Sequence, residues 1–231
     1  MRPALILLSA KAVNEIETPD NDSLIKLATA VELIHSASLV HDDIIDESEY
    51  RRKQLSLNKE FCNQTAVLVG DILYSQFFSI IINLQTVSHK QRIILLEIFA
   101  TTTRKMCIGE IYEQRIKNYN TKPTLQEYLE IIGNKTASLM SACCLSGASI
   151  NGADEKYSRA LANYGLYLGS SFQISDDCID GDSIYSSKKD LIEKAKEYSR
   201  RAKEEIAVLE QSLAKQSLLN LVEYVIGRIK E

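Results

Sequence analysis

The sequence predicts one all-α domain, and three observations lead to this fold class. Only 9 Gly and 3 Pro occur among the 231 residues, far fewer than the turns of a β-sandwich or barrel require. Hydrophobic residues make up 45% of the chain and charged residues 25%, the balance of a globular protein with a sizeable core. Apolar side chains also recur every three or four positions, which is the period of an amphipathic helix.

The N-terminal residues form the first expected helix. Arg2 and Pro3 precede a short apolar run, Ala4–Leu8, which only faintly resembles a signal peptide. Because the run is short and follows a proline, we expect a buried helix instead. No stretch approaches the roughly 20 consecutive apolar residues needed to span a bilayer.

The second helix is expected from Ser23 to Ile45, where apolar residues recur at helical spacing. Further helices are predicted at residues 60–84, 88–118, 124–147, 154–180, 187–214 and 216–230. Pro123 with Thr124 begins the helix at residue 124, and Ser187 caps the helix whose apolar stripe continues to Leu213.

Two glycines interrupt the helical patterns. Gly70 and Gly109 each cost about 1 kcal/mol relative to Ala inside a helix. Each is followed by an acidic residue, Asp71 and Glu110 respectively. We therefore expect close helix packing near a polar site at these positions.

Charge and cysteine usage narrow the functional classes. The net charge is −4, the pI is about 5.6 and no basic run stands out, so no nucleic-acid partner is expected. The five Cys show no metal-type spacing. They are expected to be small core residues in a reducing compartment, which predicts a cytoplasmic location.

Three carboxylates crowd the end of the second helix. Asp42 and Asp46 are four residues apart and share one helical face, with Asp43 beside them. Like charges at this spacing destabilise a helix unless a cation lies between them. The apolar neighbours within Leu39–Ile45 argue against a fully solvated surface.

The same D-D-x-x-D pattern returns at Asp176, Asp177 and Asp180. One cluster alone is equally well explained by a solvated acidic turn or a helix cap, but two copies, each within an apolar helix, favour metal binding. Oxygen ligands without Cys or His at ligand spacing favour Mg²⁺, whose coordination shell is commonly completed by substrate phosphates. We therefore expect two facing carboxylate groups that hold a phosphorylated ligand through Mg²⁺.

Basic residues accompany both clusters. Arg51 and Arg52 follow the first cluster, and Lys135 with Thr136 lies on another helix before the second. Guanidinium forks and lysine ammonium groups both suit phosphate oxygens, whereas surface salt bridging is the alternative for adjacent arginines.

These motifs resemble the all-trans (E-type) polyprenyl diphosphate synthases over Met1–Asp180. The resemblance is carried by Arg2-Pro3, Ile34–Asp46, Arg51-Arg52, Gly70-Asp71, Gly109-Glu110, Gln114, Lys135–Ala137 and Phe172–Asp180. It implies an isoprenoid-synthase-type bundle of antiparallel helices around a deep central cavity, usually a homodimer. It also implies a prenyltransferase that elongates an allylic diphosphate with isopentenyl diphosphate, with a peripheral membrane contact for product release.

The resemblance assigns roles position by position. The expected Mg²⁺ ligands, for three ions with bound diphosphate, are Asp42, Asp46, Asp176 and Asp180, with Asp177 beside them. The expected allylic-substrate contacts are Arg51, Lys135, Thr136 and Gln173. The expected isopentenyl diphosphate contacts are Arg2, His35 and Arg52. The residues expected to carry catalysis are Asp42, Asp43, Asp46, Arg51, Lys135 and Asp176. Without the resemblance, His35 is better explained as a buried, hydrogen-bonded helix histidine.

The implied mechanism is electrophilic. Diphosphate departs with help from Mg²⁺ and cationic side chains, the isopentenyl double bond attacks the allylic carbocation, and a proton is lost. Ala37 and Ser38, one turn before Asp42, are expected to face the cavity that receives the growing tail. Because both are small, a medium or long product is favoured over farnesyl or geranylgeranyl diphosphate; simple helix packing is the alternative explanation.

The chain departs from the family pattern at two places. A Gly-Lys pair normally precedes the Arg-Pro found at Arg2-Pro3, and a lysine- and glycine-containing loop with further helices normally follows a position like Asp180. We therefore expect one domain over residues 1–231 that is trimmed at its start and lacks a segment after about residue 182. The alternatives to elongation are a related terpenoid cyclase, a non-catalytic subunit of a heteromeric prenyl synthase, and a helical Ca²⁺-binding module.

Overall fold

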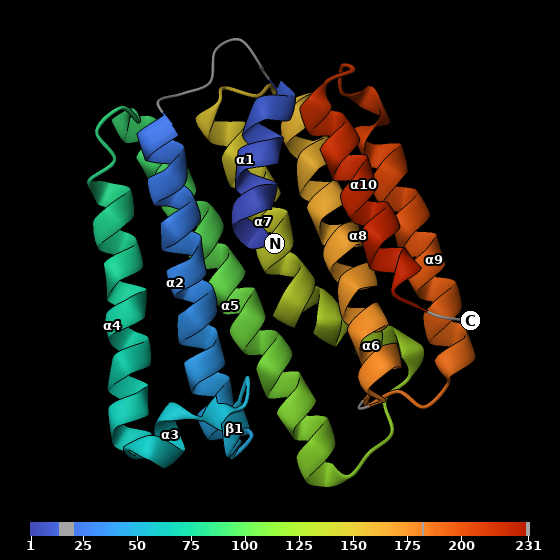
Figure 1. The fold of residues 1–231 in the computed structure, drawn as a ribbon. Coiled ribbons are helices and arrows are strands. Elements are labelled where there is room, and N and C mark those ends of the chain that lie inside the picture. The colour runs from blue at the N-terminus through green and yellow to red at the C-terminus, as the bar shows by residue number, and fades with distance from the viewer. Residues whose placement is uncertain (14–20, 182, 230–231) are drawn as a thin grey trace.

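The computed structural model describes residues 1–13, 21–181 and 183–229, and it confirms the all-α prediction (Figure 1). The elements in chain order are α1 (Arg2–Val13), α2 (Asn21–Ile45), β1 (Tyr50–Arg51), β2 (Gln54–Leu55), α3 (Leu57–Glu60), α4 (Asn63–Ile82), α5 (His89–Tyr119), α6 (Leu125–Ile132), the π-helix η1 (Gly133–Ala137), α7 (Ser138–Ile150), α8 (Glu155–Asp180), α9 (Lys188–Glu205), the 3₁₀ turn η2 (Ile206–Val208) and α10 (Leu213–Gly227).

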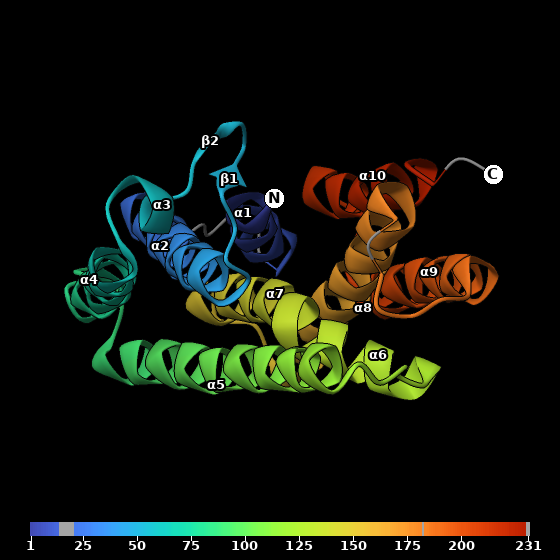
Figure 2. The same ribbon diagram turned by 90° about the horizontal axis from the view of Figure 1, so that it is seen from below.

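The main core lies among the long helices. α1 packs against α2, α7 and α10, while α7 packs against α5 and α8 (Figure 2). Side chains with no more than 1% exposure come from most of these helices and include Leu5, Phe99, Met140 and Tyr164. The N-terminal segment is thus a buried helix, as its apolar run predicts.

A satellite core joins α6, α8 and α9 near the acidic end of α8. Its buried members are Tyr128, Ile132, Ile174, Cys178, Leu191 and Ala195. Ile226 and Ile229, at the end of α10, pack against it. This second core fixes the position of the acidic end of α8 relative to α6 and α10.

Two predicted helices differ from the structure. The stretch 124–147 is interrupted by the π-helix η1 and continues to Ile150. The helix predicted at 187–214 ends at Glu205, because η2 and the extended Leu209 reverse the chain before Ser212 caps α10. Leu213 is consequently 80% exposed instead of continuing the apolar stripe.

The pattern analysis does not predict the short hairpin after α2. Tyr50 pairs with Leu55 and Arg51 with Gln54, and the two turn residues Arg52 and Lys53 have φ angles of 50° and 69°. Such left-handed positions normally carry Gly, Asn or Asp, so the turn has no sequence signal here.

Two helices, α2 from Asp22 and α4, are long and apolar enough to cross a membrane by length and composition alone. The expectation from sequence rests on consecutive apolar residues, whereas this criterion also allows scattered polar ones, and a buried core helix meets it too. α2 lies between α1 and α4, as a core helix does. α4 exposes Leu68 and Ile72 on its outer side, at 61% and 66%.

The cysteines divide into two groups. Cys143, Cys144 and Cys178 are buried, as predicted for small core residues. Cys62 and Cys107 are exposed, which corrects the prediction for these two. Cys62 lies at the start of α4, where its sulfur accepts a hydrogen bond from the Thr65 backbone N–H at 3.5 Å.

Candidate active site

The two acidic clusters lie at the neighbouring ends of α2 and α8, with α5 and η1 beside them (Figure 1). A cavity of about 420 Å³ between these elements is lined by polar residues at one end, among them Asp42, Glu110, Lys135 and Gln173. A second cavity of about 340 Å³ shares Lys135, Thr136 and Gln173 with it and adds Asp46 and Asp177. We refer to these as the main cavity and the side cavity.

Two glycines allow the helices around the main cavity to approach closely, as predicted. A Cβ atom on Gly109 would lie 2.7 Å from the backbone nitrogen of Lys135, and one on Gly70 would lie 2.1 Å from Nε2 of His41. Real Cβ atoms do not tolerate such distances. Gly109 therefore brings α5 against η1, and Gly70 brings α4 against α2.

Asp42 lines the main cavity. Burial raises the pKa of its carboxyl to about 6, and the negative charges of Glu110 and Asp46 act in the same direction, while Lys135 opposes them. Keeping a partly buried carboxylate charged costs free energy, and a bound cation beside Asp42 would offset that cost.

Asp43 points away from the main cavity and binds the hairpin. Its carboxylate accepts hydrogen bonds from Arg51: Nε lies 2.8 Å from both carboxylate oxygens and Nη2 lies 2.6 Å from Oδ1. The Asp43 side chain is only 6% exposed, whereas that of Arg51 is 39% exposed. Asp43 and Arg51, both predicted to act in catalysis, therefore engage one another, and neither lines the two cavities.

Asp46 lies one turn beyond Asp42 and is held from α5. Its carboxylate accepts hydrogen bonds from Gln114 Nε2 at 3.1 Å and Lys117 Nζ at 3.2 Å. Its backbone N–H continues the helical turn by donating to the Asp42 carbonyl. The predicted pair thus faces two adjoining cavities, with Asp42 in one and Asp46 in the other.

The π-helix η1 presents Lys135 and Thr136 to both cavities. The Lys135 ammonium lies 2.5 Å from Glu110 and 2.7 Å from Glu113. Burial lowers the pKa of Lys135, but the charges of Glu113 and Glu110 outweigh it, so the net shift is upward. Lys135 is therefore a cation that its ion pairs with Glu110 and Glu113 fix in place where the two cavities meet.

A hydrogen-bond chain orders part of the second cluster. The Thr136 hydroxyl donates to Gln173 Oε1 at 2.8 Å, and Gln173 Nε2 donates to Asp177 at 2.7 Å. The Tyr128 hydroxyl donates to the other oxygen of Asp177 at 2.5 Å. Sequence reasoning missed Tyr128, because only the packing of α6 against α8 brings it there.

The other two acids of the second cluster take different positions. Asp176 forms an ion pair with Arg228 at the end of α10. Asp180, the last residue of α8, is exposed, and neither Asp176 nor Asp180 lines the main or the side cavity. α8 ends at the left-handed Gly181, and the role of Asp180 as a metal ligand stays a prediction.

Three arginines lie close enough to His35 to affect its pKa. Burial lowers the pKa of His35 to about 3, and the charges of Arg2, Arg52 and Arg51 act in the same direction. Arg2 and His35 both line the main cavity, and Arg2 Nε is buried without a hydrogen-bond partner. The residues predicted to bind isopentenyl diphosphate thus lie near one another. Their arginines give this region an excess of positive charge, which suits an anion.

Among the described residues, no three His, Cys, Asp or Glu side chains form a ready-made metal cage. The donors nonetheless fit Mg²⁺ in type, because this ion usually takes one or two carboxylates and completes its shell with water and substrate phosphates. Asp42 and Asp46, facing adjoining cavities, are carboxylates of this kind.

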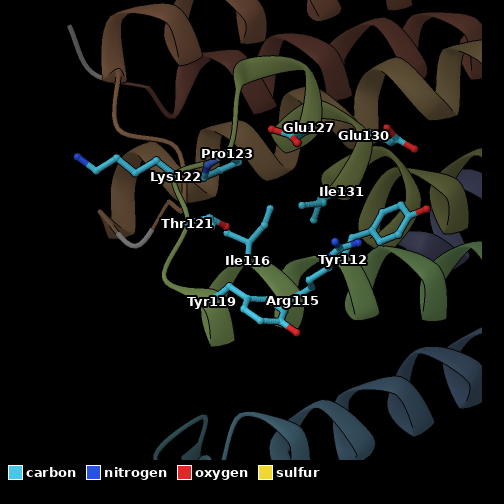
Figure 3. A pocket seen from close by; sticks show the side chains of 10 residues that line it. All are labelled: Tyr112, Arg115, Ile116, Tyr119, Thr121, Lys122, Pro123, Glu127, Glu130 and Ile131. Carbon is cyan, nitrogen blue, oxygen red and sulfur yellow. The ribbon is translucent and has the colours of Figure 1, made fainter.

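A cavity of about 620 Å³ lies outside this region, at the turn between α5 and α6 (Figure 3). Tyr112, Arg115, Tyr119, Lys122 and Glu127, which are among the side chains around it, are exposed. None of the predicted site residues lines it, so its greater size does not identify it as the reaction site.

Comparisons with known proteins identify the family of the chain. The family model described as polyprenyl synthetase matches residues 1–198. Octaprenyl diphosphate synthase of Haemophilus influenzae is 36% identical over 181 residues, covering 78% of this chain and 51% of the relative. The chain thus spans about half the length of this curated relative.

Solved structures share the fold over nearly the whole chain. Geranylgeranyl pyrophosphate synthetase from Pyrococcus horikoshii Ot3 is similar with a TM-score of 0.89 at 25% identity, covering 98% of this chain and 85% of that one. Polyprenyl synthase from Caulobacter crescentus CB15, complexed with calcium and isoprenyl diphosphate, gives a TM-score of 0.83 at 27% identity, covering 97% and 83%. The chain therefore belongs to the polyprenyl synthetase family.

Proposed function

We propose that this protein condenses an allylic diphosphate with isopentenyl diphosphate to form a trans-polyprenyl diphosphate. The observation that carries the proposal is the mixed lining of the main cavity, in which carboxylates and cations lie together with apolar side chains such as Ile34, Met106 and Phe172. A diphosphate head with an isoprenoid tail matches this combination of charged and apolar groups.

Each predicted substrate residue has a role in the proposal. Lys135, Thr136 and Gln173 hold the allylic diphosphate where the two cavities join, and Arg51 carries positive charge close by. Arg2, Arg52 and the neutral His35 hold isopentenyl diphosphate. The cations stabilise the departing diphosphate while the apolar lining excludes water from the allylic carbocation.

Mg²⁺ completes the proposed site. Asp42 and Asp46 would hold it from α2, and Asp176 from α8. When bound, Mg²⁺ neutralises negative charge that develops on the leaving diphosphate. The number of ions, three in the family resemblance, stays a prediction.

A medium or long product is proposed, in line with the octaprenyl relative. Ser38 lines the main cavity, as predicted, but Ala37 is fully buried and does not. Tyr74, one turn after Asp71 on α4, and Thr103, two turns before Glu110 on α5, also line the cavity, and the packed rings of Phe77 and Phe99 lie one turn further along. These side chains could form a floor, and this observation supports the second candidate, a shorter product such as geranylgeranyl diphosphate.

A homodimer is also proposed. The outer side of α4 exposes Leu68 and Ile72, at 61% and 66%. Exposed apolar side chains of this size, one turn apart on a long helix, are typical of a surface that a second copy covers. A cytoplasmic location with peripheral membrane contact for product release completes the proposal.

The test is incubation of the purified protein with Mg²⁺, farnesyl diphosphate and isopentenyl diphosphate, followed by mass analysis of the products. Products of six or more isoprene units are expected. Products that stop at four units would support the shorter-chain candidate. No product with any allylic primer would refute elongation and favour a non-catalytic subunit.

A further inference from the structure

The end of α10 reaches the second acidic cluster from far along the chain. Arg228 directly follows α10, and its Nη2 lies 2.7 Å from Asp176 Oδ1. Its guanidinium also lies over the Phe172 ring, 5.3 Å from the ring centroid. Phe172 and Asp176 are one turn apart on α8, so Arg228 spans that turn, and both ribbon views place the end of α10 beside α8 (Figures 1 and 2).

Packing and charge both hold this contact in place. Ile226 and Ile229, on either side of Arg228, pack against the satellite core. The side chains of Arg228 and Asp176 are 30% and 26% exposed, so their ion pair is partly shielded from water. A cation at the C-terminus of a helix is also favoured by the helix dipole.

The contact bears on metal binding, and this step rests on the proposed function, in which Asp176 is a Mg²⁺ ligand. Mg²⁺ binds carboxylate oxygens at about 2.1 Å. A dication at that distance and a guanidinium 2.7 Å from the same oxygen repel one another. The two cations therefore compete for Asp176.

We propose that Arg228 is an internal counter-ion that competes with Mg²⁺ for Asp176, so that metal loading at the second cluster releases the C-terminal end of α10. Because binding linkage is reciprocal, the Arg228 contact weakens Mg²⁺ binding by the same factor by which Mg²⁺ weakens the contact. The metal-free protein thus keeps Asp176 neutralised, and Mg²⁺ must displace a residue of the chain to load there.

Calorimetric titration with MgCl₂ alone tests the competition. Arg228→Gln is expected to bind Mg²⁺ at least about fivefold more tightly than the wild type, and Arg228→Lys, which keeps the charge, is expected to lie between them. The matched control is Lys203→Gln, which removes a different ion pair of α10, the 2.6 Å contact with Glu223, and leaves Arg228 and Asp176 unchanged. It should bind Mg²⁺ like the wild type.

Equal Mg²⁺ affinity of Arg228→Gln and the wild type would overturn the proposal, and so would the absence of Mg²⁺ binding in both. In an Asp176→Asn background, Arg228→Gln should no longer change Mg²⁺ affinity; a persisting difference would show that the effect does not act through Asp176.

Hydrogen–deuterium exchange tests the release directly. Mg²⁺ should speed amide exchange over residues 222–229 in the wild type and not in Asp176→Asn, and unchanged exchange in the wild type would refute the release. Both measurements use Mg²⁺ without prenyl substrates. Failure to form a prenyl product, with these differences intact, would therefore refute only the proposed function.

Discussion

Gly109→Ala tests whether close packing of α5 on η1 positions the site. The added Cβ would lie 2.7 Å from the Lys135 backbone nitrogen, 3.1 Å from Asn134 Cβ and 3.1 Å from the Ile131 carbonyl oxygen. Two of these three atoms belong to the backbone, so they cannot move aside as the end of a flexible side chain can. The variant must separate α5 from η1 and displace Lys135 from Glu110 and Glu113.

The magnitude follows from two opposing effects. Overpacking a tight contact costs about 1–3 kcal/mol, and three close contacts place this case near the upper end. Replacing Gly by Ala inside a helix returns about 1 kcal/mol. The net loss is therefore about 2 kcal/mol in the free energy of unfolding, which for a chain of this size lowers Tm by about 4–8 °C.

The assay is thermal unfolding followed by circular dichroism, with Gly133→Ala as the matched control. Gly133 lies in η1, the π-helix against which Gly109 of α5 packs. Its φ is −59°, and nothing lies within 4 Å of a Cβ added there. The control should keep or raise Tm. Turnover of Gly109→Ala should fall by about 100-fold, because a misplacement of about 1 Å near the reacting groups has that effect. An unchanged Tm for Gly109→Ala would refute the packing argument.

The remaining predictions concern the acidic cluster, product length and assembly. Asp42→Asn should abolish turnover yet raise stability at pH 7, because burial raises the pKa of Asp42 to about 6 in the folded protein; the gain should fade as pH falls below 6 toward the ordinary value of 3.8. Urea midpoints at pH 7 and pH 4 check this, and a less stable variant at pH 7 would contradict it. Tyr74→Ala should lengthen the products seen by mass analysis, whereas Tyr119→Ala, outside the main cavity, should not; identical products from both would remove Tyr74 as part of a floor. Ile72→Asp should convert a dimer to a monomer in light scattering, with Leu213→Asp as the exposed control, and a monomeric wild type would argue against the dimer.

Local sequence patterns predicted much of this protein. The periods of apolar residues placed the long helices, and Thr124 and Ser187 cap α6 and α9 as expected. The repeated acidic motif, with Lys135 and Gln173, predicted a candidate site, and Asp42, Lys135 and Gln173 do line one cavity. These features are predictable because helical period, caps and residue spacing depend on neighbours within a few positions.

Other features depended on contacts between distant segments. The hairpin turn at Arg52 and Lys53 carries no glycine, so the sequence has no local mark of it. The helix after Ser187 ends at Glu205 because the chain reverses to pack α10 against α8 and α9, although the apolar stripe continues past that point.

The sequence by itself determined which charged groups this protein brings to its site, and the tertiary structure decided how they are paired. Arg51 binds Asp43, Lys135 lies between Glu110 and Glu113, and Asp176 receives Arg228 from the end of α10. Asp180, which has the same motif position as Asp46, remains exposed. A side chain's ionic partner depends on which helices are packed together and how far each extends, and this is set by burial of the two cores and not by spacing along the chain.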